Sequence, residues 1–256
     1  MKKIMNRVDD FLRESLAGFA MAHSDLVTLN SEPVFIRRRQ LTPGKVALIS
    51  GGGSGHEPLH SGFVGFGMLD AACPGQVFTS PTPDQMIVAA QAADTGAGVL
   101  FVVKNYSGDV MNFEMAAEMC DTRNATVVVN DDVAVENSSH TTGRRGVAGT
   151  VIVEKVVGSL AETGADLEQC KTLANHVIGR TASMGVALTS CIVPAAGTAT
   201  FCVRDDEMEV GVGIHGEPGR RRARLGSADA ICCELLETIV GDLAPENGAE
   251  LLVLVN

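Results

Sequence analysis

Basic residues are scarce in this sequence of 256 residues, which has 20 Lys and Arg against 31 Asp and Glu. The formal net charge is -11 and the isoelectric point is about 5.0. A surface that is acidic on balance argues against nucleic acid or an anionic membrane as a partner. Small molecules and other proteins remain as the classes of ligand.

Three further absences narrow the class of protein. No segment has the ~18 uninterrupted apolar residues that a membrane helix needs, and no apolar stretch follows Met1-Lys-Lys as in a signal peptide. The seven cysteines show no C-x-x-C spacing, which favours reduced thiols over disulfides or a zinc site. We therefore expect a cytoplasmic protein that binds no metal.

Apolar runs alternate with helix-like segments through the first two thirds of the chain. The strands expected are residues 46–50, 99–104 and 125–130, and the helices expected are 83–94, 110–120, 146–162 and 166–178, after an amphipathic first helix. This alternation is typical of an α/β fold whose sheet is mostly parallel.

The pattern changes after Arg180 to short β-like runs at 185–190, 199–203 and 209–214, a helix at about 228–240 and a final apolar run at 251–255. We expect two domains, an N-terminal α/β domain of residues 1–180 and a smaller α+β domain of residues 181–256. The final run is a strand candidate with nothing after Asn256 to cover it.

A glycine-rich segment follows the first central strand, in the order Gly51-Gly-Gly-Ser-Gly-His56. Glycines there allow backbone N–H groups to approach a polar ligand closely. The segment lacks the lysine of a P-loop and the spacing of G-x-G-x-x-G or G-x-S-x-G. A glycine-rich turn without function is the alternative interpretation of the glycines alone.

Polar side chains follow each of the three central strands, namely His56, the segment from Lys104 to Asp109, and the pair Asp131-Asp132. The carboxyl ends of parallel strands share one edge, where open α/β sheets bind ligands. Histidine, lysine and aspartate at such an edge suit acid and base chemistry on a hydroxyl group. Asp131 and Asp132 could instead hold magnesium, cap a helix or lie at the sheet edge.

A second histidine, His215, lies between glycines in the segment from Gly211 to Gly219, which leaves it accessible to a substrate carbon. A surface turn is the alternative. Four arginines follow at 220–222 and 224, and they could dock an acidic partner or a phosphate or be solvated surface. The other histidines show no metal-ligand spacing and are interpreted as structural or exposed: His23, His60, His140 and His176.

An ordered set of short motifs resembles the substrate-binding subunits of dihydroxyacetone kinases, the DhaK family. These motifs span residues 50–58, 73–75, 78–83, 104–109, 112–114, 130–135, 143–148 and 213–218. Each is weak alone, but the set in this order is specific. The resemblance implies a chain that holds dihydroxyacetone and does not itself hold ATP.

The resemblance also implies roles for particular residues. His215 would add to the ketone carbon as a hemiaminal, His56 would be the general base on the attacked hydroxyl, and Asp109 would bind the substrate and support that transfer. The sugar site would be lined by Gly53, Ser54, Gly55, His56, Lys104 and Asp109. We expect His56, Asp109 and His215 to face one cavity.

Partners and cofactors follow from the same resemblance. A separate DhaL subunit would carry ADP and magnesium and would be recharged by DhaM, because this chain has no room for a fused DhaL-like domain. A homodimer is expected if the second domain is complete, although that domain looks truncated after the position of Asn256. Two alternatives stay open: a regulatory paralogue that senses dihydroxyacetone, and a kinase subunit for a related ketose such as erythrulose.

Overall fold

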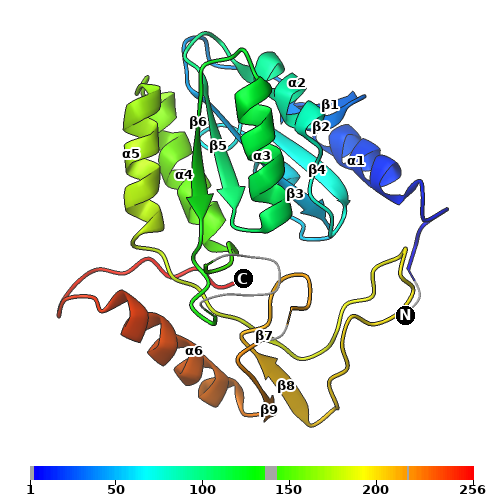
Figure 1. Cartoon of the computed structure of the whole chain (residues 1–256), viewed down its shortest axis with the longest axis vertical. Helices are drawn as coiled ribbons and strands as arrows, with labels where there is room; N and C mark the ends of the chain where they lie inside the picture. Colours follow the sequence, from blue (N-terminus) through cyan, green and yellow to red (C-terminus); the bar gives the residue numbers. More distant parts are fainter. Residues whose placement is uncertain (1–2, 136–142, 218) are drawn as a thin grey trace.

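The computed structural model describes residues 3–135, 143–217 and 219–256. A large sheet lies between two layers of helices, and a smaller lobe with its own sheet lies beneath it (Figure 1). The strands are β1 (Val27–Ser31), β2 (Val34–Arg38), β3 (Ala47–Ser54), β4 (Ala71–Val77), β5 (Val99–Lys104), β6 (Asn124–Val129), β7 (Val186–Ala187), β8 (Glu207–Val210) and β9 (Arg221–Arg224). The α-helices are α1 (Phe11–Ala22), α2 (Pro83–Ala93), α3 (Ser107–Met119), α4 (Gly149–Glu162), α5 (Leu167–Ile178) and α6 (Ala228–Leu243), and a 3₁₀ turn covers Ser61–Phe63.

The large sheet has the strand order β1-β2-β4-β3-β5-β6. Strands β4, β3, β5 and β6 are parallel, as expected, but β1 and β2 run antiparallel to each other and β2 runs antiparallel to β4. The sheet is therefore mixed and not parallel throughout. Only two residues separate β1 from β2, and so short a connection permits an antiparallel pair alone.

The two faces of the sheet are buried under different helices. Leu100 and Val102 of β5 pack in the cluster that holds α1, α4 and α5, whereas Phe101 and Val103 pack in the cluster that holds α2 and α3. Side chains alternate between the faces of a strand, so a strand buried on both sides is apolar throughout. This explains why the central strands could be predicted from short apolar runs.

The structure departs most from expectation at β3. The glycines were expected to form a loop after the strand and before a helix, but β3 continues through them to Ser54 and pairs with β4. A Cβ atom added at Gly51 would lie 2.6 Å from the carbonyl oxygen of Cys73. The glycines therefore let β4 and its following segment approach the strand more closely than any side chain would permit.

Two helices begin at positions that matter for the polar edge of the sheet. Helix α3 begins at Ser107, three residues before its predicted start, which puts Asp109 in its first turn. Helix α4 begins at Gly149, and the carboxylate of Asp131 accepts hydrogen bonds from the backbone N–H groups of Val147 and Gly149. Of the alternatives left open for Asp131, the structure shows the helix cap.

The small lobe contains the antiparallel sheet β7-β8-β9 and helix α6. Two of its predicted strands do not form: residue 199 makes only an isolated bridge with Ile192, and residues 251–255 are exposed and carry no strand. An apolar run marks a strand only when a neighbouring strand completes its hydrogen bonds. The domain boundary at residue 181 stays a prediction.

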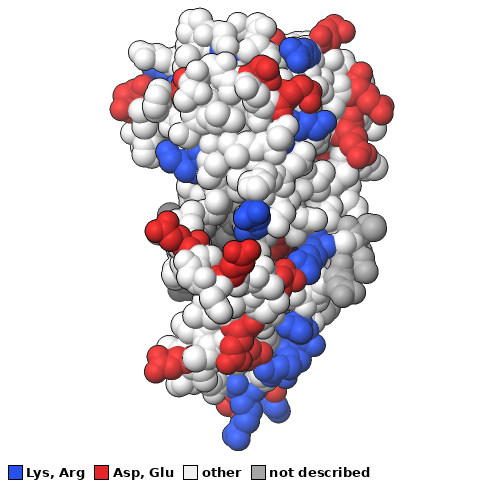
Figure 2. Space-filling model, turned by 90° about the vertical axis from the view of Figure 1, so that its left-hand side faces the viewer, with Lys and Arg blue, Asp and Glu red and all other residues white. Residues whose placement is uncertain are grey.

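Charge is unevenly distributed over the surface. Basic side chains gather at the end of the molecule formed by β9 (Figure 2). Arg221 pairs with Glu234 of α6 and Arg222 pairs with Glu209 of β8, so part of this charge is compensated locally. Among the described residues, no helix is long and apolar enough to cross a membrane.

Replacing Asp131 should destabilise the fold, because the Asp131→Ala substitution leaves two backbone N–H groups at the start of α4 without their acceptor. We expect a loss of roughly 2 kcal/mol in the free energy of unfolding, measured by urea denaturation. The exposed Asp121 provides a control, and Asp121→Ala should change the value by less than about 0.5 kcal/mol. Equal losses in the two variants would contradict the capping role.

Candidate active site

Two histidines from distant parts of the chain meet beyond the carboxyl end of β3. The ring centroids of His56 and His215 lie 4.8 Å apart, with the rings at 74° to one another. His56 follows β3 directly, and His215 lies in the turn after β8. The structure thus brings together the two side chains that the sequence singled out.

Two aromatic rings surround this pair. Phe78 stacks on His56 with centroids 4.6 Å apart and lies edge-on to His215, and Tyr106, the only tyrosine of the chain, lies edge-on to His215 at 4.7 Å. Both occur in motifs quoted above, but sequence reasoning gave neither a role. For Tyr106, the available signal was that the only tyrosine of the chain lies in the same segment as the catalytic candidate Asp109.

His56 is held in its neutral form. Burial, helped by the neighbouring His215 and Lys104, lowers its pKa to about 3. Its Nε2 atom is buried and has no hydrogen-bond partner among the described residues. A neutral imidazole nitrogen with a free lone pair can accept a proton from a bound hydroxyl group.

Glu217 fixes the orientation of His215. Its carboxylate accepts a hydrogen bond from the backbone N–H of His215 at 3.1 Å and lies 3.0 Å from Nδ1 of the ring. Burial alone would raise the pKa of Glu217, but these hydrogen bonds and the ring of His215 lower it to about 2. An ionised carboxylate can only accept, so Nδ1 of His215 carries the proton that it donates to Glu217.

Glu217 was quoted in a motif but not assigned a role from the sequence. The spacing His215-Gly-Glu217 would have allowed this role to be predicted. A single intervening glycine lets the chain turn so that the carboxylate reaches the histidine ring. Gly216 has φ +83°, a conformation that favours glycine.

Asp109 and Lys104 form a second polar group next to the glycine strand. An oxygen of the Asp109 carboxylate lies 3.9 Å from Nζ of Lys104, and the other oxygen, Oδ1, is buried without a hydrogen-bond partner among the described residues. A Cβ atom at Gly52 would collide with the Lys104 ammonium. Gly52 therefore makes the space that the lysine occupies.

The predicted lining residues differ in what they can offer a ligand. Gly53 is packed against the backbone of Phe78 and Thr79, and the hydroxyl of Ser54 donates to the carbonyl of Gly75 at 2.7 Å. Gly55 has φ +98° and is exposed. These residues shape the edge of the strand, whereas the free polar atoms belong to His56 and Asp109.

His60 was interpreted as structural or exposed, and the structure shows it buried against Lys104 and Glu154. No local pattern indicates this contact, because Glu154 lies 94 residues later on α4. His140 lies outside the described residues.

Asp131 and Asp132 are fully occupied by protein partners. Asp131 caps α4, and the Asp132 carboxylate accepts from the guanidinium of the buried Arg145 at 2.7 Å. Arg145 also donates to the carbonyl of Gly211, which ties the end of β6 to the turn that carries His215. Within the described part of the chain, no group of three or more His, Cys, Asp or Glu residues is arranged to hold a metal.

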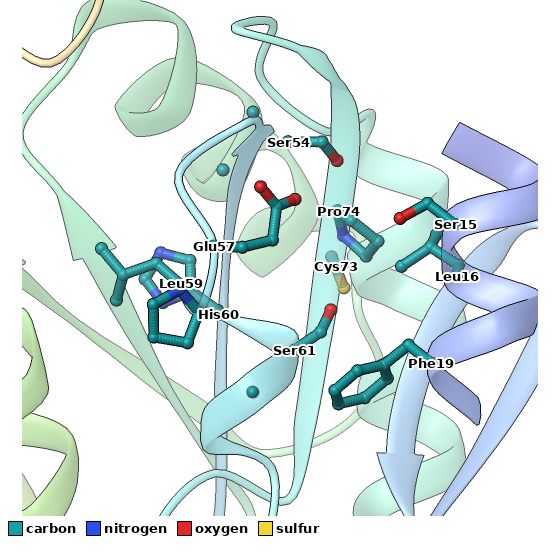
Figure 3. Close-up of a pocket in the computed structure, with 14 residues that line it drawn as sticks. Ser15, Leu16, Phe19, Ser54, Glu57, Leu59, His60, Ser61, Cys73 and Pro74 are labelled. Carbon is teal, nitrogen blue, oxygen red and sulfur yellow. The ribbon is translucent and has the colours of Figure 1, made fainter. Parts of the chain in front are cut away.

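A cavity of about 360 Å³ lies between α1 and the end of β3. Figure 3 shows Glu57, His60 and Ser61 on one side and Leu16 and Phe19 of α1 on the other. His56, Asp109 and His215 do not line it, and their convergence on a cavity of their own stays a prediction. The two histidines contact each other directly.

The chain matches the Dak1 domain over residues 17–256. It is 51% identical over 259 residues to the PTS-dependent dihydroxyacetone kinase 1, dihydroxyacetone-binding subunit DhaK, of Listeria innocua, covering the whole chain and 79% of that protein. It is 51% identical over 244 residues to the corresponding PEP-dependent subunit of Escherichia coli, covering 94% of the chain and 68% of that protein.

Two solved structures resemble the fold. The dihydroxyacetone kinase of C. freundii superimposes with a TM-score of 0.88 at 36% identity, over 96% of this chain but only 46% of the kinase chain. A dihydroxyacetone kinase operon co-activator, DhaQ, superimposes with a TM-score of 0.84 at 31% identity, over 90% of this chain and 71% of its own.

The neutral state of His56 can be tested by NMR of its ring resonances. Because the pKa is about 3, the resonances should stay constant from pH 8 to pH 5, where a free histidine titrates near 6.5. The Phe78→Ala substitution removes the ring stacked on His56 and should raise the pKa toward the ordinary value. Titration of the wild-type ring between pH 5 and pH 8 would contradict this description.

Proposed function

Because this chain belongs to the Dak1 domain family, we propose that it is the dihydroxyacetone-binding subunit of a PTS-dependent dihydroxyacetone kinase. The observation that carries the proposal is the contact between the rings of His56 and His215, whose centroids lie 4.8 Å apart. One ring can hold a small ketone, and the other can accept the proton of its hydroxyl group.

His215 captures the ketone by addition. Nε2 donates its lone pair to the carbonyl carbon, the C–N bond forms and the carbonyl π pair moves to oxygen, which then takes a proton from solvent water. The ring becomes cationic in this step, and the Glu217 carboxylate on Nδ1 stabilises that charge or removes the Nδ1 proton. A ketone can form this bond and glycerol cannot, so the adduct selects the substrate.

His56 and Asp109 act on the hydroxyl group that becomes phosphorylated. The buried Nε2 of His56 accepts the hydroxyl proton as the oxygen attacks phosphorus, and Oδ1 of Asp109 accepts a hydrogen bond from the sugar. The Lys104 ammonium beside Asp109 balances the negative charge there. Gly53, Ser54 and Gly55 form the wall that lets the small sugar approach the strand. Orientation by the covalent bond supplies much of the rate of a phosphoryl transfer.

The phosphoryl donor belongs to a partner in this proposal. A DhaL subunit with ADP and magnesium would dock over the histidine pair and would be recharged by DhaM.

Asp131 and Asp132 do not suit magnesium, because their carboxylates are used by backbone N–H groups and Arg145. The basic β9 edge at 221–224 is a candidate contact for an acidic partner surface, and a homodimer remains part of the proposal.

A regulatory role is the second candidate, because the fold also resembles a co-activator of the dihydroxyacetone kinase operon. Both proteins would bind the ketose, so binding alone does not separate them. Reconstitution with DhaL, DhaM and the phosphotransferase components does: formation of dihydroxyacetone phosphate supports the kinase, and binding without turnover supports the sensor. Erythrulose in the same assay tests the third possibility.

The covalent step predicts a tetrahedral carbon on His215. Dihydroxyacetone labelled with ¹³C at the carbonyl should lose its ketone resonance on binding, and the intact mass should rise by one whole molecule, because addition releases no water. His215→Ala should abolish both signals, whereas His176→Ala on α5 should keep them. A ketone resonance that persists in the wild-type complex would rule out the adduct.

Glu217→Gln should slow formation of the adduct on the order of 100-fold or more. The amide removes the negative charge and can donate to Nδ1, which moves the ring proton to Nε2 and blocks the nucleophile. The rate is measured from the time course of the ¹³C signal. Glu207→Gln on β8, which weakens the exposed pairs with Arg204 and Arg222, is the matched control and should stay within about twofold.

A further inference from the structure

Three titratable side chains from three parts of the fold form a buried hydrogen-bonded row beneath the glycine strand. Nζ of Lys104 lies 2.7 Å from Nε2 of His60, and Nδ1 of His60 lies 2.7 Å from Oε1 of Glu154. The three residues are 1%, 6% and 0% exposed, so water does not replace these contacts. A row of this kind is costly to bury unless each group satisfies the next.

The chemistry of the groups fixes the direction of the hydrogen bonds. A lysine ammonium can only donate, so Nε2 of His60 accepts from Lys104 and the single proton of the neutral ring lies on Nδ1. That proton is donated to Glu154. Lys104 also donates to the carbonyl of Gly51 at 3.2 Å, which aims its ammonium at the end of β3.

We propose that His60 and Glu154 are positioning residues for Lys104, which hold its ammonium at the floor of the active site and keep it protonated beside Asp109. This inference rests on the proposed function, since it assigns Lys104 to the kinase reaction. Neither His60 nor Glu154 touches the substrate. Both act through the lysine.

The charges around Lys104 support this assignment. Burial lowers the pKa of Lys104, and the carboxylates of Asp109 on α3 and Glu154 on α4 raise it again. His56 and His60, in the segment after β3, are the other titratable groups that face it, and both are neutral because burial lowers their pKa values. Asp109, and Glu154 where it is ionised, are therefore the carboxylates that favour the protonated form of Lys104.

The pH range in which Glu154 matters follows from its own ionisation. Burial raises the pKa of Glu154 to about 8, against the opposing effect of Lys104. Above that pH the ionised carboxylate of Glu154 supports the charge of Lys104, whose own pKa is lowered by burial. Removing the carboxylate lowers the pKa of Lys104. As the pH is raised, Lys104 therefore loses its proton, and the enzyme its activity, at a lower pH than in the wild type.

The test compares the pH dependence of kcat/KM for dihydroxyacetone in the reconstituted kinase. Glu154→Gln should match the wild type below about pH 7, and the alkaline limb of its profile should move down by about one pH unit. Glu162→Gln is the matched control, since this carboxylate lies on the same helix but pairs with Arg38 away from the site. Its alkaline limb should coincide with that of the wild type.

Two substitutions at His60 separate positioning from packing. The amide of His60→Gln can accept from Lys104 and donate to Glu154, so it should retain the wild-type profile within about 0.3 pH units. His60→Leu can do neither and should shift the alkaline limb as Glu154→Gln does. The proposal is overturned if folded Glu154→Gln and His60→Leu give profiles parallel to the wild type at all pH values, or if His60→Gln fails as completely as His60→Leu.

The adduct on His215 separates this inference from the proposed function. The ¹³C signal at pH 6.5 should appear in the wild type and in every variant at His60 and Glu154, which also shows that the variants fold. If the wild type forms neither adduct nor dihydroxyacetone phosphate, the proposed function is wrong. If it forms both and the alkaline limbs coincide, only the positioning role of His60 and Glu154 is wrong.

Discussion

The contact between His56 and His215 is the constraint on which the remaining arrangement depends. One ring comes from the end of the central strand and the other from the small lobe, and the two meet only because Arg145 ties the turn before His215 to the end of β6. Phe78 stacks on His56 and lies edge-on to His215. A neutral imidazole has a lone pair that can attack carbon or accept a proton, and a protonated ring has none.

Much of the large sheet follows from local patterns. The apolar runs at β5 and β6 and the helical spacing along α2 and α5 predicted those elements, and β5 is buried along its whole length. The sequence pattern failed to predict the end of β3, where packing against another strand decides the structure. Glycines read as a loop became the last part of β3, because only the neighbouring strand β4 reveals why side chains are excluded there.

The residues of the candidate site likewise divide into those that a local pattern indicates and those that only the folded structure shows. His56, Asp109, Lys104 and His215 could be found because they follow strand ends or stand among glycines, and a resemblance supplied their roles. His60 and Glu154 could not be found, because a buried hydrogen bond between residues 94 positions apart leaves no local pattern. The alternatives for Asp131 and Asp132 were equally undecidable until their partners, the start of α4 and Arg145, were in place.

The bare backbone at the end of β3 has a consequence for engineering. In the proposed site, Gly51, Gly52 and Gly53 have no side chain to exchange for a larger or smaller group. Changes of preference among short ketoses must come from the rim, where Phe78 and Tyr106 border the histidine pair. Directed evolution toward longer sugars should therefore accumulate substitutions on those flanking segments and leave the strand untouched.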